Sequence, residues 1–280
     1  MDGRRAGRAP AGRRRGPHSR QPVSPLSGVR VLVTRPAQQA GALCDLIESA
    51  GGHCLRQPLF SIESAADPAA LRPAMTRAED ADWLIFTSAN AVEQAWAVAP
   101  DWRPRGGLAA IGQATAAALR DQSCLADDRE VILPESDFRS EGLLALPAMH
   151  DLDGQHVALV TGEGGRGALA EAILARGGQV ERLAVYRRLP CPVASDRMLA
   201  LLGEADIAVL TSGESVSRLV QLSPPGMDGQ LRQLQLVVPS NRVLKMALDF
   251  GFEHRPLLPE KVNNESILAV LIRWAEQGFR

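Results

Sequence analysis

The sequence predicts an α/β protein made of two similar halves, each a doubly wound parallel sheet. The first observation is an internal repeat: Val31-Leu32-Val33-Thr34 returns as Ala158-Leu159-Val160-Thr161, and Phe86-Thr87-Ser88 returns as Leu210-Thr211-Ser212 at nearly the same spacing. Such ordered self-similarity indicates duplication. The second observation is that short β-rich runs alternate with helical stretches along the whole chain, as in α/β proteins.

The first half predicts five strands. Residues 29–34 form a strand, and the helix over 38–50 ends at Gly51-Gly52, as glycine at a C-cap favours. Residues 53–60 form the next strand, followed by a polar helix near 67–78. Three more strands are predicted over 83–87, 108–111 and 130–133, each followed by a helical segment.

The second half repeats this order. Its predicted strands are 156–161, 180–187, 207–211, 236–238 and 254–258. Residues 157–160 and 207–210 are continuously apolar, which is typical of parallel strands buried on both faces by helices. Each half is therefore predicted to be a five-stranded doubly wound unit.

Composition is ordinary for a soluble globular protein. The chain has 280 residues, 45% of them hydrophobic and 22% charged, so two domains are expected. No apolar run approaches the length of a membrane span. Four scattered cysteines without a Cys-x-x-Cys pair argue for a reducing, cytoplasmic location and against a zinc site. We expect no metal, membrane or nucleic-acid partner.

Residues 1–28 differ from the rest of the chain. They carry seven arginines against one acid, Asp2, and are rich in proline, glycine and serine without an apolar segment. This predicts a disordered arginine-rich arm, or a start assigned too early, rather than a secretory signal. An arm that binds nucleic acid remains an alternative.

Small hydroxyl residues and glycines follow the predicted strands at their carboxyl ends, where ligands bind in doubly wound sheets. The segments are 34–35, 87–90, 112–115, 162–167, 211–213 and 240–242. Free amides at helix starts favour anions. The simpler alternative is that these serines and threonines only cap helices. Because the segments are six, we expect an anionic ligand in a cleft between the halves.

Residues 162–167 spell G-x-G-x-x-G after a strand and before a helix, which alone suggests dinucleotide binding. The following strand ends in Tyr186-Arg187-Arg188 rather than in an acid for the ribose, and Glu181 lies at its start. Arg187 could meet an NADP phosphate, so an NADP-dependent enzyme stays open as an alternative.

Taken together, several segments resemble the uroporphyrinogen-III synthase family. They are 31–36 (VLVTRP), 85–92 (IFTSANAV), 110–116 (AIGQATA), 162–164 (GEG), 185–188 (VYRR) and 210–212 (LTS). The similarity extends over roughly residues 29–277, and its strength lies in the order and spacing of the segments.

The resemblance implies two flavodoxin-like domains that exchange elements and are joined by a two-stranded linker. One discontinuous domain would comprise 29–59 and 191–280, and the other 60–190. The crossovers would fall near Pro58 and near Leu189-Pro190, where proline suits an extended segment. Hinge motion between the domains is expected.

The resemblance also implies the activity. The family cyclises hydroxymethylbilane, a linear tetrapyrrole with eight carboxylates, to uroporphyrinogen III, with loss of water and inversion of one ring through a spiro intermediate. It is a lyase that needs no cofactor. We expect a monomer with a functional link to hydroxymethylbilane synthase.

Tyr186, the only tyrosine, matches the family's functionally implicated tyrosine and is the predicted general acid. Its alternative role is packing at a domain edge.

Other residues match the family's substrate contacts by their position in the sequence. Ser88 and Asn90 match a turn that binds a carboxylate, and Thr115 matches a residue that contacts substrate through its hydroxyl. Ser212 is the duplicate of Ser88 in the second repeat. Arg166 and Arg242 are candidates for carboxylate pairing. The remaining substrate-binding candidates are Thr34, Arg35, Gly162, Gly164 and Ser240. A non-catalytic module that binds a tetrapyrrole or another anion is the second alternative.

Overall fold

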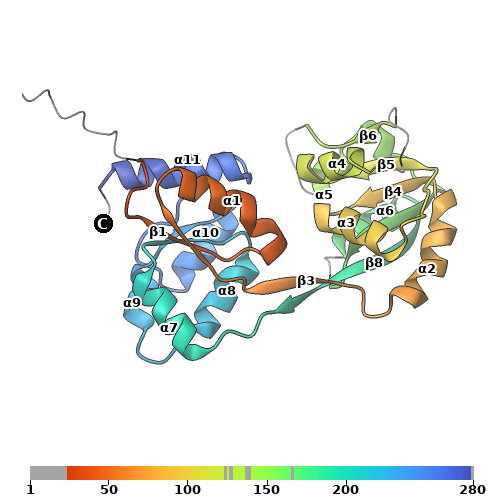
Figure 1. Ribbon diagram of the computed structural model, residues 1–280. Helices are drawn as coiled ribbons and strands as arrows, with labels where there is room; N and C mark the ends of the chain where they lie inside the picture. The colour runs from red at the N-terminus through yellow and green to blue at the C-terminus, as the bar shows by residue number, and fades with distance from the viewer. Residues whose placement is uncertain (1–23, 123–124, 126–128, 136–139, 165–166, 279–280) are drawn as a thin grey trace, which may run out of the picture.

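The computed structural model describes residues 24–122, 125, 129–135, 140–164 and 167–278. Two sheets, one fully parallel and one parallel except for an edge strand, are each covered by helices and form two lobes that lie side by side (Figure 1). The α/β class with parallel-sheet domains is confirmed. In the described part of the chain, no helix is both long enough and apolar enough to cross a membrane.

The first lobe, here the four-stranded lobe, is built on a fully parallel sheet in the order β10-β9-β1-β2. Its strands are β1 (Arg30–Val33), β2 (His53–Arg56), β9 (Ile207–Val209) and β10 (Gln235–Val237). Its helices are α1 (Ala37–Ser49), α7 (Ser195–Glu204), α8 (Gly213–Leu222), α9 (Asp228–Gln233), α10 (Asn241–Asp249) and α11 (Asn264–Glu276).

The second lobe, the six-stranded lobe, has the order β3-β8-β7-β4-β5-β6. Its strands are β3 (Phe60–Ser64), β4 (Trp83–Phe86), β5 (Gly107–Ala110), β6 (Val131–Ile132), β7 (His156–Gly162) and β8 (Gln179–Pro190). Its helices are α2 (Pro68–Arg77), α3 (Ala89–Val98), α4 (Gln113–Arg120), α5 (Ser140–Leu144) and α6 (Ala168–Ala175), with short 3-10 turns over Ala78–Asp80 and Pro147–Met149.

The two sequence repeats exchange strands between the sheets. β1 and β2 of the first repeat pair with β9 and β10 of the second, whereas β7 and β8 of the second repeat join β4, β5 and β6 of the first. Apart from β3, the strands of both lobes follow one flavodoxin-like order, in which the first strand of one repeat lies beside the third strand of the other.

The expectation of five parallel strands in each half is wrong in two places. The predicted strand 53–60 is interrupted at Pro58 and becomes β2 and β3, and β3 pairs antiparallel with β8 in the other sheet. Proline cannot donate to a ladder, so the interruption follows from the residue. The predicted strand 254–258 is reduced to one bridge between Val237 and Leu257.

Two further expectations about the four-stranded lobe need correction. The predicted disordered arm ends earlier than residue 28, because Leu26 is completely buried and donates its amide to Ala50 O; residues 1–23 lie outside the described residues. The cysteines are not all isolated: Cys44 of α1 and Cys54 of β2 form a disulfide. The turn at Gly51, whose φ is +85°, reverses the chain between them.

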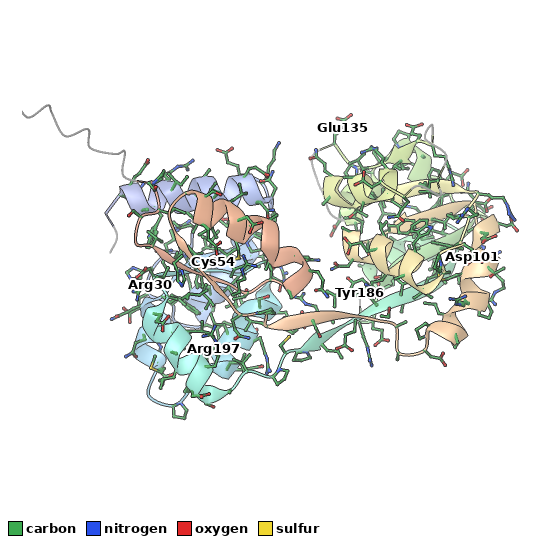
Figure 2. The ribbon with its side chains drawn as sticks, viewed as in Figure 1. Arg30, Cys54, Asp101, Glu135, Tyr186 and Arg197 are labelled. Carbon is green, nitrogen blue, oxygen red and sulfur yellow. A yellow bond between two sulfur atoms is a disulfide. The ribbon has the colours of Figure 1, made fainter. Side chains whose placement is uncertain are left out.

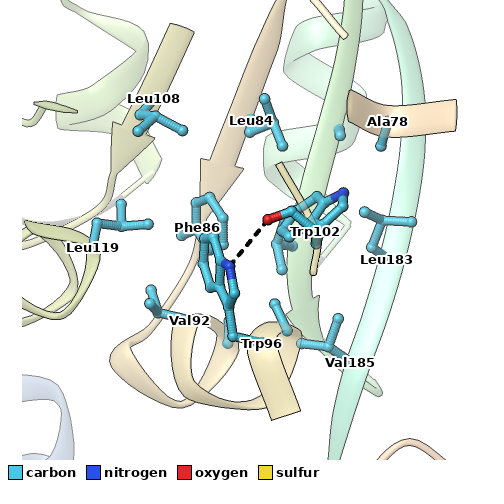
Figure 3. Packing of buried hydrophobic residues seen from close by; sticks show 14 of the residues in the cluster. Ala78, Leu84, Phe86, Val92, Trp96, Trp102, Leu108, Leu119, Leu183 and Val185 are labelled. Carbon is cyan, nitrogen blue, oxygen red and sulfur yellow. Dashed lines mark hydrogen bonds between the residues drawn. The ribbon is translucent and has the colours of Figure 1, made fainter. Parts of the chain in front are cut away.

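An aromatic cluster lies in the core of the six-stranded lobe (Figure 3). Phe86, at the end of β4, is completely buried, and its ring centroid is 5.9 Å from that of Trp96 and 6.2 Å from that of Trp102. The indole of Trp96 donates to Trp102 O, and that of Trp102 to Met75 O. Because Phe86 directly precedes Thr87 and Ser88, this packing fixes the turn that leads into α3.

We expect Phe86→Ala to lower the free energy of unfolding of the six-stranded lobe by about 3–5 kcal/mol, because it leaves a cavity among large rings. Denaturant titration followed by tryptophan fluorescence reports mainly on this lobe, since three of the four tryptophans, Trp83, Trp96 and Trp102, belong to it. Leu174→Ala, at a side chain that is 56% exposed, is the control and should cost less than about 0.5 kcal/mol. A loss below about 1 kcal/mol for Phe86→Ala would contradict this account.

Candidate functional site between the two lobes

Tyr186 lies on β8 where this strand runs from one lobe toward the other (Figure 2). The register of β7 and β8 shifts between Thr161 and Gly162, so that Gly162 pairs with Tyr186 and one residue of β8 is left over. A bulge of this kind changes the direction in which the next side chain points. The ring packs on Gly162, where an added Cβ would come within 2.6 Å of the tyrosine Cζ. Gly162 therefore makes room for the ring.

The hydroxyl of Tyr186 lies 3.3 Å from Ser88 Oγ, and either oxygen can donate. Ser88 is the N-cap of α3, and its Oγ accepts the amide of Ala91. Since this Oγ already accepts one hydrogen bond, its own proton is free to be given to the phenol oxygen. The pair joins a proton donor to the amino end of a helix, where negative charge is favoured.

Ser212 holds the equivalent position in the other lobe. It is the N-cap of α8, its Oγ accepts the amide of Ser215, and the two serine oxygens are 2.9 Å apart. Nη2 of Arg188, two residues after Tyr186 on β8, donates to Ser212 Oγ at 3.4 Å. One strand thus contacts the caps of both α3 and α8.

Asn90, on the first turn of α3, accepts a hydrogen bond from the side chain of Gln39 on the first turn of α1. These helices belong to different lobes (Figure 1). The contact brings the helix start after β1 and the helix start after β4 together, so the carboxyl ends of the two sheets face each other here. Both side chains are polar and neither is fully buried.

Arg35 follows β1 and is partly buried. Its Nη1 donates to Asn264 Oδ1 of α11 at 2.6 Å, and its Nε has no hydrogen-bond partner among the described residues. Burial lowers the pKa of this guanidinium, although arginine still keeps its charge. Because the partly buried guanidinium of Arg35 donates to a neutral amide rather than to a carboxylate, its charge favours the approach of an anion.

The remaining predicted substrate-binding residues lie in positions that suit ligand binding less well. Thr34 and Thr115 are buried, and Thr34 donates its hydroxyl to Val209 O, so this hydroxyl serves the sheet rather than a ligand. Ser240 caps α10 through the amide of Val243, and Arg242 beside it is exposed. Gly164 has a φ of +73° in an open turn. Arg166 lies outside the described residues.

Two contributors were not predicted from the sequence. Gln39 and Arg188 contact the site only because the repeats exchange strands, which places α1 beside α3 and β8 beside α8. Arg188 belongs to the VYRR segment, so the resemblance marked its neighbourhood without assigning it a role. The sequence feature that could have identified Arg188 is its spacing of two residues from Tyr186, because residues two apart on a strand lie on the same face.

A cavity of about 490 Å³ is found elsewhere, lined by Gln235, Leu244, Trp274, Gln277 and residues 254–258. Gln235 begins β10 and Trp274 is near the end of α11, so the cavity lies at the amino-end edge of the four-stranded sheet. It does not coincide with the candidate site.

Comparison with known proteins points to one family. The family model described as uroporphyrinogen-III synthase HemD matches residues 41–269. The uroporphyrinogen-III synthase of Escherichia coli K12 is 26% identical over 256 residues, covering 86% of this chain and 99% of that protein. The uroporphyrinogen-III synthase of Synechococcus elongatus is 30% identical over 224 residues, covering 74% of this chain and 80% of that protein.

Solved structures of the same name share the fold. A mutant uroporphyrinogen III synthase from the extremely thermophilic bacterium Thermus thermophilus superposes with a TM-score of 0.61 at 19% identity, over 89% of this chain and 99% of that one. The protein from Helicobacter pylori 26695 gives a TM-score of 0.59 at 14% identity, over 88% and 99%. Since the family model matches most of the sequence, this chain belongs to the uroporphyrinogen-III synthase family.

Proposed function

We propose that this chain cyclises hydroxymethylbilane to uroporphyrinogen III, as a lyase, in the space between its two lobes. The observation that carries the proposal is the pair of Tyr186 and Ser88, which sets a proton donor beside a helix N-cap at the junction of the lobes. The family relationship supplies the reaction, and these residues supply a physical basis for its first step.

In that step the terminal hydroxyl of the substrate leaves as water. Tyr186 donates its proton to the departing oxygen, and the hydroxyl of Ser88 then donates to the phenolate that remains. The protonated, electrophilic azafulvene left behind is attacked by the substituted carbon of the far pyrrole, which gives a spiro intermediate. Fragmentation and reclosure invert that ring, and the proton released when the pyrrole regains its aromaticity returns to the phenolate of Tyr186. The separation of 3.3 Å between the two hydroxyl oxygens is long for such a pair, as is common before substrate binds.

The substrate's carboxylates need donors in both lobes. We assign them to the amides at the starts of α3 and α8, to Asn90 and to Arg35, with Arg242 as an exposed cation at the start of α10. Holding a flexible molecule by its two ends brings the reacting carbons together and contributes to catalysis through positioning.

We further propose the domain division 29–59 with 191–280 against 60–190, and a monomeric enzyme. Both crossovers then meet at one place, where the amide of Cys191 donates to Leu59 O. Because every assigned residue comes from one chain, the mechanism requires no second copy.

The alternatives are less well supported. An NADP-dependent enzyme would use Arg187 or Glu181, but Arg187 pairs with Glu63, and Glu181 pairs with Arg77 and His156. A binding module without catalysis would leave the closeness of Tyr186 and Ser88 without a purpose.

A coupled assay tests the function. Freshly generated hydroxymethylbilane is mixed with the protein, the products are oxidised, and the porphyrin isomers are separated. We expect the type III isomer to dominate. Only type I, as in the control without enzyme, would refute the proposal and favour a binding module.

In the same assay we expect Tyr186→Phe to lower kcat about 10- to 100-fold without abolishing turnover, because a general acid assists a leaving group that departs slowly unaided. The phenyl ring still packs on Gly162, so thermal stability should stay close to that of the wild type. An unchanged kcat would remove Tyr186 from the mechanism.

We expect Gly162→Ala to lower kcat as much as Tyr186→Phe, because the new Cβ would lie 2.6 Å from the tyrosine Cζ and must displace the ring. The double variant should then be no slower than Tyr186→Phe alone. Gly203→Ala is the control, since nothing lies within 4 Å of its added Cβ. This control should keep full activity. Wild-type kcat in Gly162→Ala would show that the ring position is unimportant.

We expect Arg35→Met to raise KM about tenfold while the free energy of unfolding stays constant or increases, since the partly buried charge it removes is held by a neutral amide rather than by a carboxylate. Steady-state kinetics and thermal unfolding measure the two effects. A loss of more than about 2 kcal/mol of stability with KM unchanged would instead assign Arg35 to the fold.

A further inference from the structure

Strand β8 presents two side chains on one face, and each contacts the helix cap of a different lobe. Tyr186 and Arg188 are two residues apart, so they point the same way. The hydroxyl of Tyr186 is 3.3 Å from Ser88 Oγ, and Nη2 of Arg188 is 3.4 Å from Ser212 Oγ. Ser88 and Ser212 are equivalent residues of the two repeats.

The guanidinium of Arg188 is held from several sides. It lies over the ring of Phe60, 4.4 Å from the ring centroid, and its Nη1 is 3.1 Å from a carboxylate oxygen of Glu214. Nη2 also donates to Ser215 Oγ at 3.5 Å. Phe60 belongs to β3, the strand that pairs with β8, so one side chain ties both linker strands to the first turn of α8.

This placement is unfavourable for the helix itself. A cation at a helix N-terminus opposes the helix dipole, so Arg188 does not stabilise α8 by charge. Glu214, in the first turn, offsets the repulsion, but its side chain is 56% exposed and such pairs contribute little. The contacts therefore fix geometry more than they add stability.

We propose that Arg188 is a positioning residue: through Ser212 it holds the α8 cap at a set distance from Tyr186. The inference rests on the proposed function and extends it, since the ends of one substrate must reach groups in both lobes. Without Arg188 the ribbon of β3 and β8 could turn relative to α8, and the two caps would no longer fit one ligand at once.

The test is Arg188→Met, which keeps an apolar stem against Phe60 while it removes the guanidinium. We expect KM for hydroxymethylbilane to rise about tenfold, kcat to change less than about threefold, and the type I fraction to increase as free substrate closes unaided. Arg187→Met is the matched control: Arg187 points to the other strand face and pairs with Glu63. It should match the wild type in KM and isomer ratio.

Unchanged KM and isomer ratio in Arg188→Met, with or without a lower melting temperature, would overturn the proposal. A cycle with Ser212→Ala separates positioning from direct contact. We expect the double variant to have a KM no higher than the worse single variant, because Arg188 acts through Ser212. Additive effects would mean that Arg188 acts independently of Ser212, which also overturns the proposal.

Failure of the proposed function is distinguishable from failure of this inference. If the wild-type chain gives no excess of type III isomer, the function is wrong whatever Arg188 does. If the wild type is active and Arg188→Met behaves like it, only the positioning role is lost.

Discussion

The antiparallel pairing of β3 with β8 is the constraint that gives the site its geometry. Five residue pairs, from Phe60 with Pro190 to Ser64 with Tyr186, form the ribbon between the lobes. The same pairing sets the face on which Tyr186 and Arg188 project. If the register slipped by one residue, both would point to the opposite face and neither cap would be contacted. The pairing of β3 with β8 therefore both joins the lobes and orients Tyr186 and Arg188.

The exchange of strands between the repeats links the two lobes. Each repeat contributes two strands to one sheet and the rest to the other, so equivalent turns, such as those at Ser88 and Ser212, end up in different lobes. In the proposed function, this duplicated turn supplies the two halves of one anion-binding site. The hydrogen bond between Gln39 and Asn90 joins the two lobes at α1 and α3. The hydrogen bond from Arg188 to Ser212 joins β8 to the start of α8.

Much of the fold could be predicted from local sequence, because apolar runs and glycine caps mark buried strands and helix ends. The start of α3 after β4 followed directly from Phe86-Thr87-Ser88. What could not be predicted depends on contacts distant in sequence. The bulge beside Gly162 aims Tyr186, Thr34 turns its hydroxyl into the sheet toward Val209, and Cys44 meets Cys54 across a tight turn. None of these leaves a periodic signal.

The central claim is that one ligand contacts the caps of α3 and α8 together. Amide NMR of the wild-type chain titrated anaerobically with uroporphyrinogen III tests it most directly. The account predicts that the resonances of residues 89–91 and 213–215 move in the same titration with a single dissociation constant. Shifts confined to one lobe, or to the cavity beside Trp274, would contradict it.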